Sequence, residues 1–169
     1  MKALRGLYIH IPFCPQICPY CAFASLRGVD YLHERYVSAL CKELSVWSRQ
    51  YRKNPLQTIF IGGGTPTQID PSLIGQVLEA ADYAFGMCTD AEITVEANPG
   101  TVDREKFSKL RSVGCNRLSL GVQSFDNQAL KKLGRVHSSE EAERAFTSAR
   151  EAGFSNVSVD LIFSVPDVA

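Results

Sequence analysis

The sequence predicts an α/β fold with a parallel sheet, and three observations support this prediction. Short apolar runs of strand length alternate with longer stretches in which apolar residues recur every three or four positions. Strands that alternate with helices pair in parallel through right-handed crossovers. The composition of the 169 residues, with 45% hydrophobic and 21% charged residues, is typical of one globular domain and excludes a disordered or collagen-like chain.

The first half of the chain contains three predicted strands and two predicted helices. In order, they are a strand over 7–11, a cysteine-rich loop over 12–28, a helix over 29–51, a strand over 58–61, a helix over 71–85 and a strand over 93–96. Asp70 is expected to cap the second helix, with Pro71 at its first position. The first helix has an apolar stripe on one side, formed by Leu32, Tyr36, Leu40, Leu44, Trp47 and Tyr51.

The second half continues the alternation up to a fifth strand. It comprises a helix over 103–112, a strand over 117–123, helices over 126–133 and 139–152, and a strand over 157–163. The alternation fits either a doubly wound sheet or a barrel. The chain stops six residues after the fifth strand, at Ala169, and no helix follows to cover that strand. We therefore expect a fragment of a longer, barrel-like protein, in which residues 1–169 form the N-terminal part of one domain.

Charge and hydropathy exclude several classes of protein. Lys and Arg together number 18, as do Asp and Glu, so the chain lacks the basic excess of a generic nucleic-acid-binding protein. No run approaches the roughly 18 apolar residues of a membrane span. Residues 1–6 lack the apolar segment of a secretory signal. We therefore expect a cytoplasmic protein, whose six cysteines stay reduced and suit metal binding better than disulfides.

Unusual residues follow, or lie in, each of the five predicted strands. They are Cys14, Cys18 and Cys21 after the first strand, 62–67 after the second, 96–100 at the end of the third, 121–125 at the end of the fourth, and Asp160 in the fifth. In parallel α/β folds, ligands bind at the carboxyl ends of the strands. The sequence therefore predicts a single site at that end of the sheet.

The cysteine-rich loop carries the most specific chemistry. Cys14, Cys18 and Cys21 are three thiols within eight residues, and iron–sulfur clusters are held by cysteine thiolates, usually four. Three ligands would leave one iron open to a small molecule. Zinc with His10 as a fourth ligand is an alternative, and so are three inert buried thiols. The other cysteines are interpreted as structural, with Cys88 in a connection; they are Cys41, Cys88 and Cys115.

The remaining motifs are weaker when taken alone. The run 62–65 is either a tight turn or a loop whose backbone can approach an amino-acid head group. Glu96 and Gln123 could accept hydrogen bonds from a ligand or cap neighbouring loops. Asp160 lies in an otherwise apolar strand, where a carboxylate is costly to bury without a partner. Arg135 is a candidate partner for Asp160 or for a ligand carboxylate, and the alternative is a solvated surface residue near Lys131 and Lys132.

Together, these motifs resemble the radical S-adenosylmethionine (SAM) superfamily and, more narrowly, its HemN/HemW group. The resemblance covers nearly the whole chain in the expected order, through the segments 7–14, 60–67, 95–101, 121–125 and 160–163. It implies an α/β fold of a partial, TIM-like (β/α)6 barrel, truncated here after about five strands. It also implies a smaller C-terminal domain that this chain does not include.

The resemblance also implies cofactors. Cys14, Cys18 and Cys21 would bind a 4Fe–4S cluster, and SAM would chelate the open iron through its amino and carboxylate groups. One electron, from a donor of the flavodoxin or ferredoxin type, would cleave SAM to methionine and a 5′-deoxyadenosyl radical. The positions that match SAM contacts are Tyr8, Tyr20, Gly63, Gly64, Thr65, Glu96, Gln123, Arg135 and Asp160.

Within the group, the chain is most similar to HemW proteins, which bind haem and are regarded as haem chaperones. The alternative is a HemN-like, oxygen-independent coproporphyrinogen III oxidase of porphyrin biosynthesis. That oxidase has a fourth cysteine where this chain has Phe23, and a long arm where only six residues precede Leu7. Ala22 and Ala24 depart from the usual HemW residues. The haem-associated histidine motif of HemW lies in the C-terminal part, outside this chain.

This interpretation implies haem or a porphyrin as a partner, with membrane contact only through a haem recipient. The scaffold could in principle cleave SAM, so the sequence leaves open whether the chain is an enzyme. A zinc-stabilised α/β binding module remains a second alternative.

Overall fold

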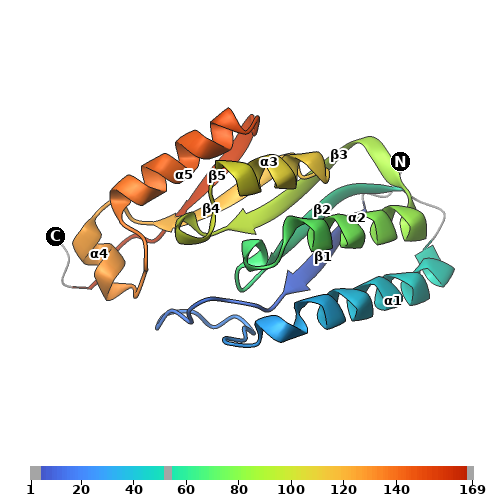
Figure 1. Ribbon diagram of the computed structural model, residues 1–169, viewed down its shortest axis with the longest axis horizontal. Coiled ribbons are helices and arrows are strands. Elements are labelled where there is room, and N and C mark those ends of the chain that lie inside the picture. The colour runs from blue at the N-terminus through green and yellow to red at the C-terminus, as the bar shows by residue number, and fades with distance from the viewer. Residues whose placement is uncertain (1–4, 52–54, 167–169) are drawn as a thin grey trace.

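The computed structural model describes residues 5–51 and 55–166, which form a parallel five-stranded sheet (Figure 1). The strands lie in sequence order, and each is parallel to its neighbours. They are β1 (Gly6–Ile11), β2 (Leu56–Gly63), β3 (Met87–Ala97), β4 (Arg117–Gln123) and β5 (Asn156–Leu161). Because β1 and β5 pair with one neighbour each, the sheet is open, as a partial barrel requires.

The helices lie on one face of this sheet and follow the same order as the strands (Figure 1). Their bounds are α1 (His33–Tyr51), α2 (Pro71–Phe85), α3 (Arg104–Ser112), α4 (Asn127–Lys132) and α5 (Ser139–Glu151). Three short 3-10 helices are η1 (Asp30–Leu32), η2 (Pro66–Gln68) and η3 (Pro99–Thr101). Along the row, α1 packs on α2, α2 on α3, and α3 on α5. None of the helices in the described ranges has the length and apolar character needed to span a membrane.

Side-chain caps fix where most helices begin. The predicted N-cap Asp70 is confirmed, since its carboxylate accepts a hydrogen bond from the Ser72 N–H at 2.8 Å. Asp103 and Asp126 cap α3 and α4 in the same way. At α5, the Ser138 side chain and the Glu141 side chain each bond to the other's backbone, which is a complete capping box.

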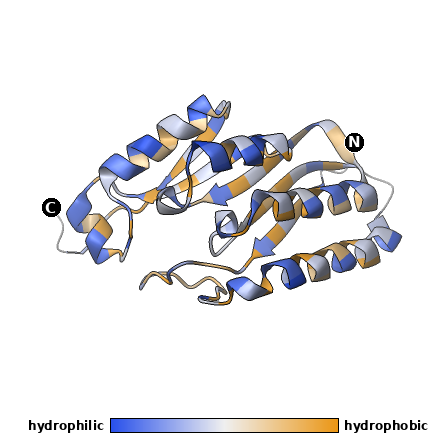
Figure 2. Ribbon diagram, in the orientation of Figure 1, coloured by the Kyte–Doolittle hydropathy of each residue, from blue (hydrophilic) through white to orange (hydrophobic). Residues whose placement is uncertain are grey.

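The two faces of the sheet differ in chemistry because side chains alternate along each strand. On the helix-covered face, Ile9, Ile59, Val95 and Leu118 are almost completely buried and form the centre of the core. The other face carries polar residues near the carboxyl ends of β3, β4 and β5. Figure 2 shows this alternation of hydrophobic and hydrophilic residues along the strands. The polar face is the side on which a ligand could lie.

One detail of the prediction was wrong. Strand β3 begins at Met87, so Cys88 lies in a strand rather than in a connection. The apolar stripe of α1 is buried only in part, since Trp47 and Tyr51 near the helix end remain 47% and 46% exposed. Elsewhere the predicted elements are observed with shifts of a few residues at their ends, and residues 29–32 precede α1 as a turn and the helix η1.

Candidate functional site

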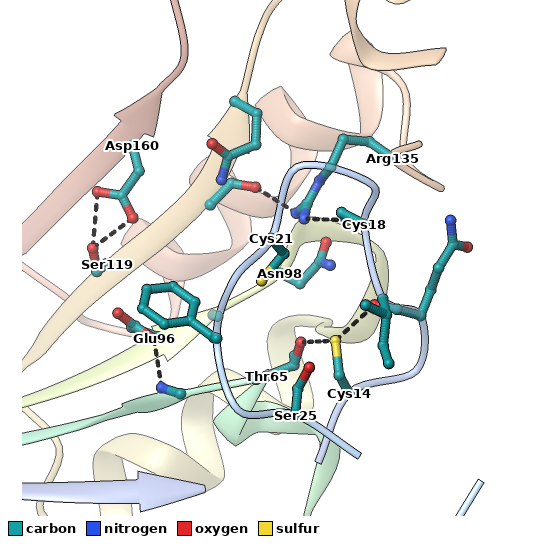
Figure 3. A pocket seen from close by; sticks show the side chains of 18 of the residues that line it. Cys14, Cys18, Cys21, Ser25, Thr65, Glu96, Asn98, Ser119, Arg135 and Asp160 are labelled. Atoms are coloured by element: carbon teal, nitrogen blue, oxygen red, sulfur yellow. Dashed lines mark hydrogen bonds between the residues drawn. The ribbon is translucent and has the colours of Figure 1, made fainter. Parts of the chain in front are cut away.

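A cavity of about 610 Å³ opens at the carboxyl ends of the strands, between the polar face of the sheet and the cysteine loop, residues 12–28 (Figure 3). Eleven of the twelve site residues predicted from the sequence line it. They are Cys14, Cys18, Tyr20, Cys21, Gly63, Gly64, Thr65, Glu96, Gln123, Arg135 and Asp160. The topology therefore brings together groups that lie up to 146 positions apart in the sequence.

The cysteine loop is folded back on itself and presents its thiols to the cavity. The Cys14 N–H donates to Leu26 O at 2.9 Å, and the Leu26 N–H donates to Pro12 O at 2.7 Å. The Cys14 thiol donates to Gln16 O at 2.8 Å and lies 3.3 Å from Thr65 Oγ1. All three loop cysteines are free thiols. They surround part of the cavity wall, and no three His, Cys, Asp or Glu side chains of the described residues meet closely enough to hold a single metal ion.

Gly62 and Gly63 end β2 and Gly64 follows it, and a side chain at each of the three positions would meet a different neighbour. A Cβ on Gly62 would lie 2.9 Å from Phe60 Cε1 and 3.0 Å from Glu96 Oε2, so this glycine leaves room for two side chains of the cavity wall. Gly63 has a φ of +125°, and a Cβ there would lie 2.6 Å from Ile11 O. A Cβ on Gly64 would lie 2.7 Å from Phe13 O. The run therefore lets the loop pack against the end of β1 and the start of the cysteine loop.

The backbone N–H groups of Gly63, Gly64 and Thr65 already donate hydrogen bonds within the protein. The Gly63 N–H donates to Glu96 Oε2 at 3.0 Å, the Gly64 N–H to Ile11 O at 2.9 Å, and the Thr65 N–H to Phe13 O at 2.7 Å. What the loop can offer a ligand is carbonyl oxygens rather than N–H groups. Such oxygens accept hydrogen bonds from an ammonium group but not from a carboxylate.

Glu96 is partly buried at the end of β3, in the centre of the wall. Burial raises the pKa of its carboxyl group, and the negative charge of Asp160 adds to this rise. The hydrogen bond from Gly63 N–H and the nearby His10 act in the opposite direction. A cationic ligand group beside Glu96 would favour its ionised form in the same way.

Arg135 and Asp160 do not pair, so of the two partners considered for Arg135 the Asp160 carboxylate is wrong. The Asp160 carboxylate instead accepts from Ser119 Oγ, at 3.1 and 2.9 Å. The Arg135 guanidinium donates to Gly121 O at 2.7 Å and to Cys18 Sγ at 3.6 Å (Figure 3). Its buried Nε has no hydrogen-bond partner, which leaves a donor available to an anionic group in the cavity.

Tyr20 and Gln123 complete the wall. Burial raises the pKa of Tyr20 to about 12, although the positive charge of Arg135 opposes the rise, so its hydroxyl stays neutral at physiological pH. Gln123 has a φ of +72°, which is uncommon for a residue with a side chain and costs about 1–2 kcal/mol. It ends β4 where the pairing with β5 shifts register. Backbone strain of this kind clusters at functional sites.

Tyr8 is the one predicted site residue that does not line the cavity. Its side chain lies on β1, stacked on Phe60, and its hydroxyl lies 3.0 Å from His10 Nδ1. The other ring nitrogen of His10 lies 2.8 Å from Ala24 O and must donate to it. Because both nitrogens of His10 are engaged in this way, the ring is not placed as a fourth zinc ligand beside the cysteines.

Comparison with known proteins identifies the scaffold. The sequence profile described as the Radical SAM superfamily matches residues 8–168. The chain belongs to the radical SAM superfamily.

The chain is also similar to curated proteins over nearly its full length. The chain is 42% identical to the "Heme chaperone HemW" of Escherichia coli strain K12, over 164 residues that cover 96% of this chain and 43% of that protein. It is 39% identical to the protein of the same name from Bacillus subtilis strain 168, with the same coverage. The chain thus spans less than half the length of these relatives.

Solved structures confirm the fold class predicted from the sequence. The coproporphyrinogen III oxidase HemN from Escherichia coli superposes with a TM-score of 0.90 at 29% identity, covering 99% of this chain and 39% of that chain. Methylornithine synthase superposes with a TM-score of 0.61 at 16% identity, covering 96% of this chain and 45% of that chain, and supports the fold alone. The open parallel sheet is therefore part of a radical SAM (β/α) barrel.

Radical SAM membership implies a 4Fe–4S cluster and SAM, and the residues present fit both. Three free thiols line one cavity, as a cluster with three protein ligands requires. The unpartnered Arg135 Nε suits a carboxylate, and Glu96 suits an ammonium group. These groups lie within the same cavity, so the two ends of an amino-acid ligand could be held at once.

Several residues that line the cavity were missed from the sequence. They include Gln16, Phe60, Arg117, Ser119 and Ser158. The alternation of side chains along a strand could have found some of them, because residues two positions apart lie on the same face of the sheet. Ser158 lies two positions before Asp160, and Ser119 lies two positions before Gly121. Register then aligns Glu96 with Ser119 and Ser119 with Ser158 across neighbouring strands.

Proposed function

We propose that this chain is the cluster- and SAM-binding part of a HemW-like haem chaperone, and that residues 1–169 form the N-terminal part of its radical SAM core domain. The observation that supports this most directly is the cavity, which is lined by three cysteines with free thiols, by Arg135, whose buried Nε has no hydrogen-bond partner, and by Glu96. A single-metal site does not require the latter two groups, whereas an amino-acid ligand beside a cluster does.

Each residue then has a defined task. Cys14, Cys18 and Cys21 would hold the 4Fe–4S cluster, which when bound would pass one electron to SAM. The Arg135 guanidinium would pair with the SAM carboxylate, since charge-assisted hydrogen bonds to carboxylates are among the strongest available. Glu96 and the carbonyl oxygens of the glycine run would accept hydrogen bonds from the SAM ammonium group.

The nucleoside part of SAM would lie along the rest of the wall. Asp160 is exposed to the cavity and held by Ser119, so its carboxylate is placed to accept from ribose hydroxyls. Tyr20 offers a neutral aromatic surface for the adenine ring. Gln123 can both donate and accept through its amide. Tyr8 would act from outside the cavity, through its stacking on Phe60.

The residues of the cysteine loop favour a haem chaperone over a coproporphyrinogen III oxidase. Phe23 stands where the oxidase has its extra cysteine; its side chain lines the cavity and is 65% exposed. The identities of 42% and 39% to HemW proteins, against 29% to HemN, point the same way. Haem is therefore the proposed cargo, and a flavodoxin or ferredoxin the proposed electron donor.

The first test is anaerobic reconstitution with iron and sulfide, followed by electron paramagnetic resonance of the reduced chain with and without SAM. A 4Fe–4S signal that changes when SAM is added supports the proposed site. Stoichiometric zinc with no iron uptake would instead support the zinc-stabilised binding module. A cluster signal that ignores SAM would contradict the assignment of Arg135 and Glu96.

A second test separates chaperone from oxidase. Haem is titrated into this chain and into full-length HemW from Escherichia coli as a reference, and the Soret band is followed. Binding by the reference alone would place the haem site outside these residues, and binding by both would place it within them. Anaerobic conversion of coproporphyrinogen III to protoporphyrinogen IX by this chain would overturn the chaperone assignment.

A further inference from the structure

The cysteine loop touches the turn that follows α4, more than one hundred residues further along the chain. Gln16 Nε2 donates a hydrogen bond to Gly134 O at 2.6 Å. The Cys18 thiol lies 4.0 Å from the same oxygen. Next in sequence, Arg135 Nη1 donates to Cys18 Sγ at 3.6 Å. Residues 133–135, here called the Gly134 turn, therefore contact the segment 16–19 around Cys18, the middle one of the three cysteines.

The approach of the two segments is close enough to exclude a side chain on the turn. A Cβ on Gly134 would lie 2.8 Å from Pro19 Cδ and 3.5 Å from Pro19 Cγ. The proline ring is rigid, so it cannot rotate away as a long side chain would. Gly134 also has a φ of +68°, as glycines that end helices commonly do. Helix capping explains that backbone angle, but it does not explain the contact with Pro19 or the hydrogen bond from Gln16.

We propose that the Gly134 turn is a docking point that holds the cysteine loop in its cluster-binding position, and that Gln16 is the positioning residue that secures it. The inference rests on the proposed role of the loop cysteines as cluster ligands. Preorganisation by groups other than the ligands themselves is a recognised requirement of metal sites.

The same turn joins the loop to the ligand cavity. Arg135 reaches Cys18 with one guanidinium nitrogen and leaves Nε available to a ligand. A shift of the turn therefore moves the thiol and the proposed carboxylate-binding group together. Hydrogen bonds to cluster sulfurs raise reduction potentials, so loss of the Arg135–Cys18 contact should lower the potential.

Four variants test the proposal. Gln16→Ala removes the hydrogen bond to Gly134 O. Gln16→Glu keeps the size of the side chain but replaces the amide group that donates this bond. Gly134→Ala places a methyl group against Pro19. Gly153→Ala is the matched control, because Gly153 also follows a helix with a positive φ of +93°, but its Cβ would meet nothing closer than Arg111 Nε at 4.0 Å.

The first readout needs no metal: the rate at which iodoacetamide modifies Cys18 in the metal-free chain, measured by mass spectrometry. Both Gln16 variants should raise this rate about fivefold, the factor expected for loss of one hydrogen bond. Gly134→Ala should raise it further, and Gly153→Ala should match the unmodified chain. Equal rates for Gln16→Glu and the unmodified chain would overturn the role of the hydrogen bond.

The second readout uses reconstituted protein. The Gln16 variants should bind less iron and show a lower reduction potential, with an altered resonance signal, while circular dichroism stays unchanged. If the unmodified chain takes up no iron, the proposed function fails, and the alkylation rates still decide whether the loop is docked. If Gly134→Ala and Gly153→Ala behave alike in both readouts, Gly134 is only a helix cap and the docking proposal is wrong.

Discussion

The hydroxyl of Ser119 on β4 lies 3.1 and 2.9 Å from the two carboxylate oxygens of Asp160 on β5. Ser119 is buried, whereas Asp160 faces the cavity. The serine is itself placed by Ser158, whose Oγ lies 3.2 Å from Ser119 Oγ and receives a hydrogen bond from Arg117 Nη2 at 3.3 Å. A short polar chain across the strands thus orients the one carboxylate that the fifth strand presents to a ligand.

Ser119→Ala should weaken SAM binding by the reconstituted chain. The substitution leaves Asp160 in place but removes its donor, and a hydrogen bond of this kind contributes about 1 kcal/mol, or roughly fivefold in Kd. Isothermal titration calorimetry measures the change. Ser108→Ala on the outer surface of α3 serves as the control and should leave the Kd unaltered. An unchanged Kd for Ser119→Ala would show that the orientation of Asp160 does not matter for SAM.

Glu96→Gln should stabilise the metal-free chain at neutral pH while weakening its affinity for SAM after reconstitution. Burial raises the pKa of Glu96 above its ordinary value of 4.5, so the folded state binds the proton more tightly than the unfolded state. The stability associated with this proton is present below pH 4.5 and is lost as the pH rises through the folded pKa. Urea unfolding at several pH values should therefore show an advantage of the glutamine variant that grows above pH 4.5. A constant difference would contradict this explanation.

Gly64→Ala should destabilise the chain more than Gly62→Ala does. The new methyl group at position 64 meets backbone oxygens of Phe13 and Pro12, which cannot rotate away, and we expect a loss of about 1–3 kcal/mol in unfolding free energy. At position 62 it meets the side chains of Phe60 and Glu96, which can move. That variant should lose SAM affinity rather than stability. Urea unfolding and calorimetry together distinguish the two, and the reverse order of stability would refute the assignment.

Cys115 should resist alkylation under conditions that modify Cys88. Burial raises the pKa of the Cys115 thiol to about 12, so at pH 8 only about one molecule in ten thousand carries the thiolate. Mass spectrometry after a timed reaction with iodoacetamide measures both sites in one sample. Modification of Cys115 as fast as Cys88 would mean that the core around it opens readily.

Gln123→Gly should be more stable than Gln123→Ala, although both lose the same amide. Alanine keeps the unfavourable backbone conformation at φ +72°, whereas glycine adopts it without strain. After the extra chain entropy of glycine is subtracted, we expect a difference of about 0.5–1 kcal/mol. Thermal or urea unfolding measures it, and an alanine variant of equal or greater stability would argue against strain at this position.

Sequence patterns sufficed for the order of the elements and for the grouping of the predicted residues around one cavity. Both follow from local periodicity and from the rule that parallel α/β folds gather ligand-binding residues at the carboxyl ends of their strands. They failed where the outcome depends on contacts between distant segments. The pairing of Asp160 with Ser119 rather than Arg135 depends on the register of β4 and β5. The contact of Arg135 with Cys18 depends on where the turn after α4 ends. Neither contact can be recognised from the residues next to it in the sequence.

The sequential strand order has a consequence for how the protein is made. Each strand pairs only with its neighbours in the sequence, so β1, β2 and β3 can assemble on one another while later residues are still being synthesised. The hydrogen bond between Gln16 and Gly134 cannot form until residue 134 exists. During synthesis, the three thiols are therefore present well before the support that positions them. On the proposed function, iron would be loaded only after residue 134 has been made, and the nascent thiols would need a reducing environment until then.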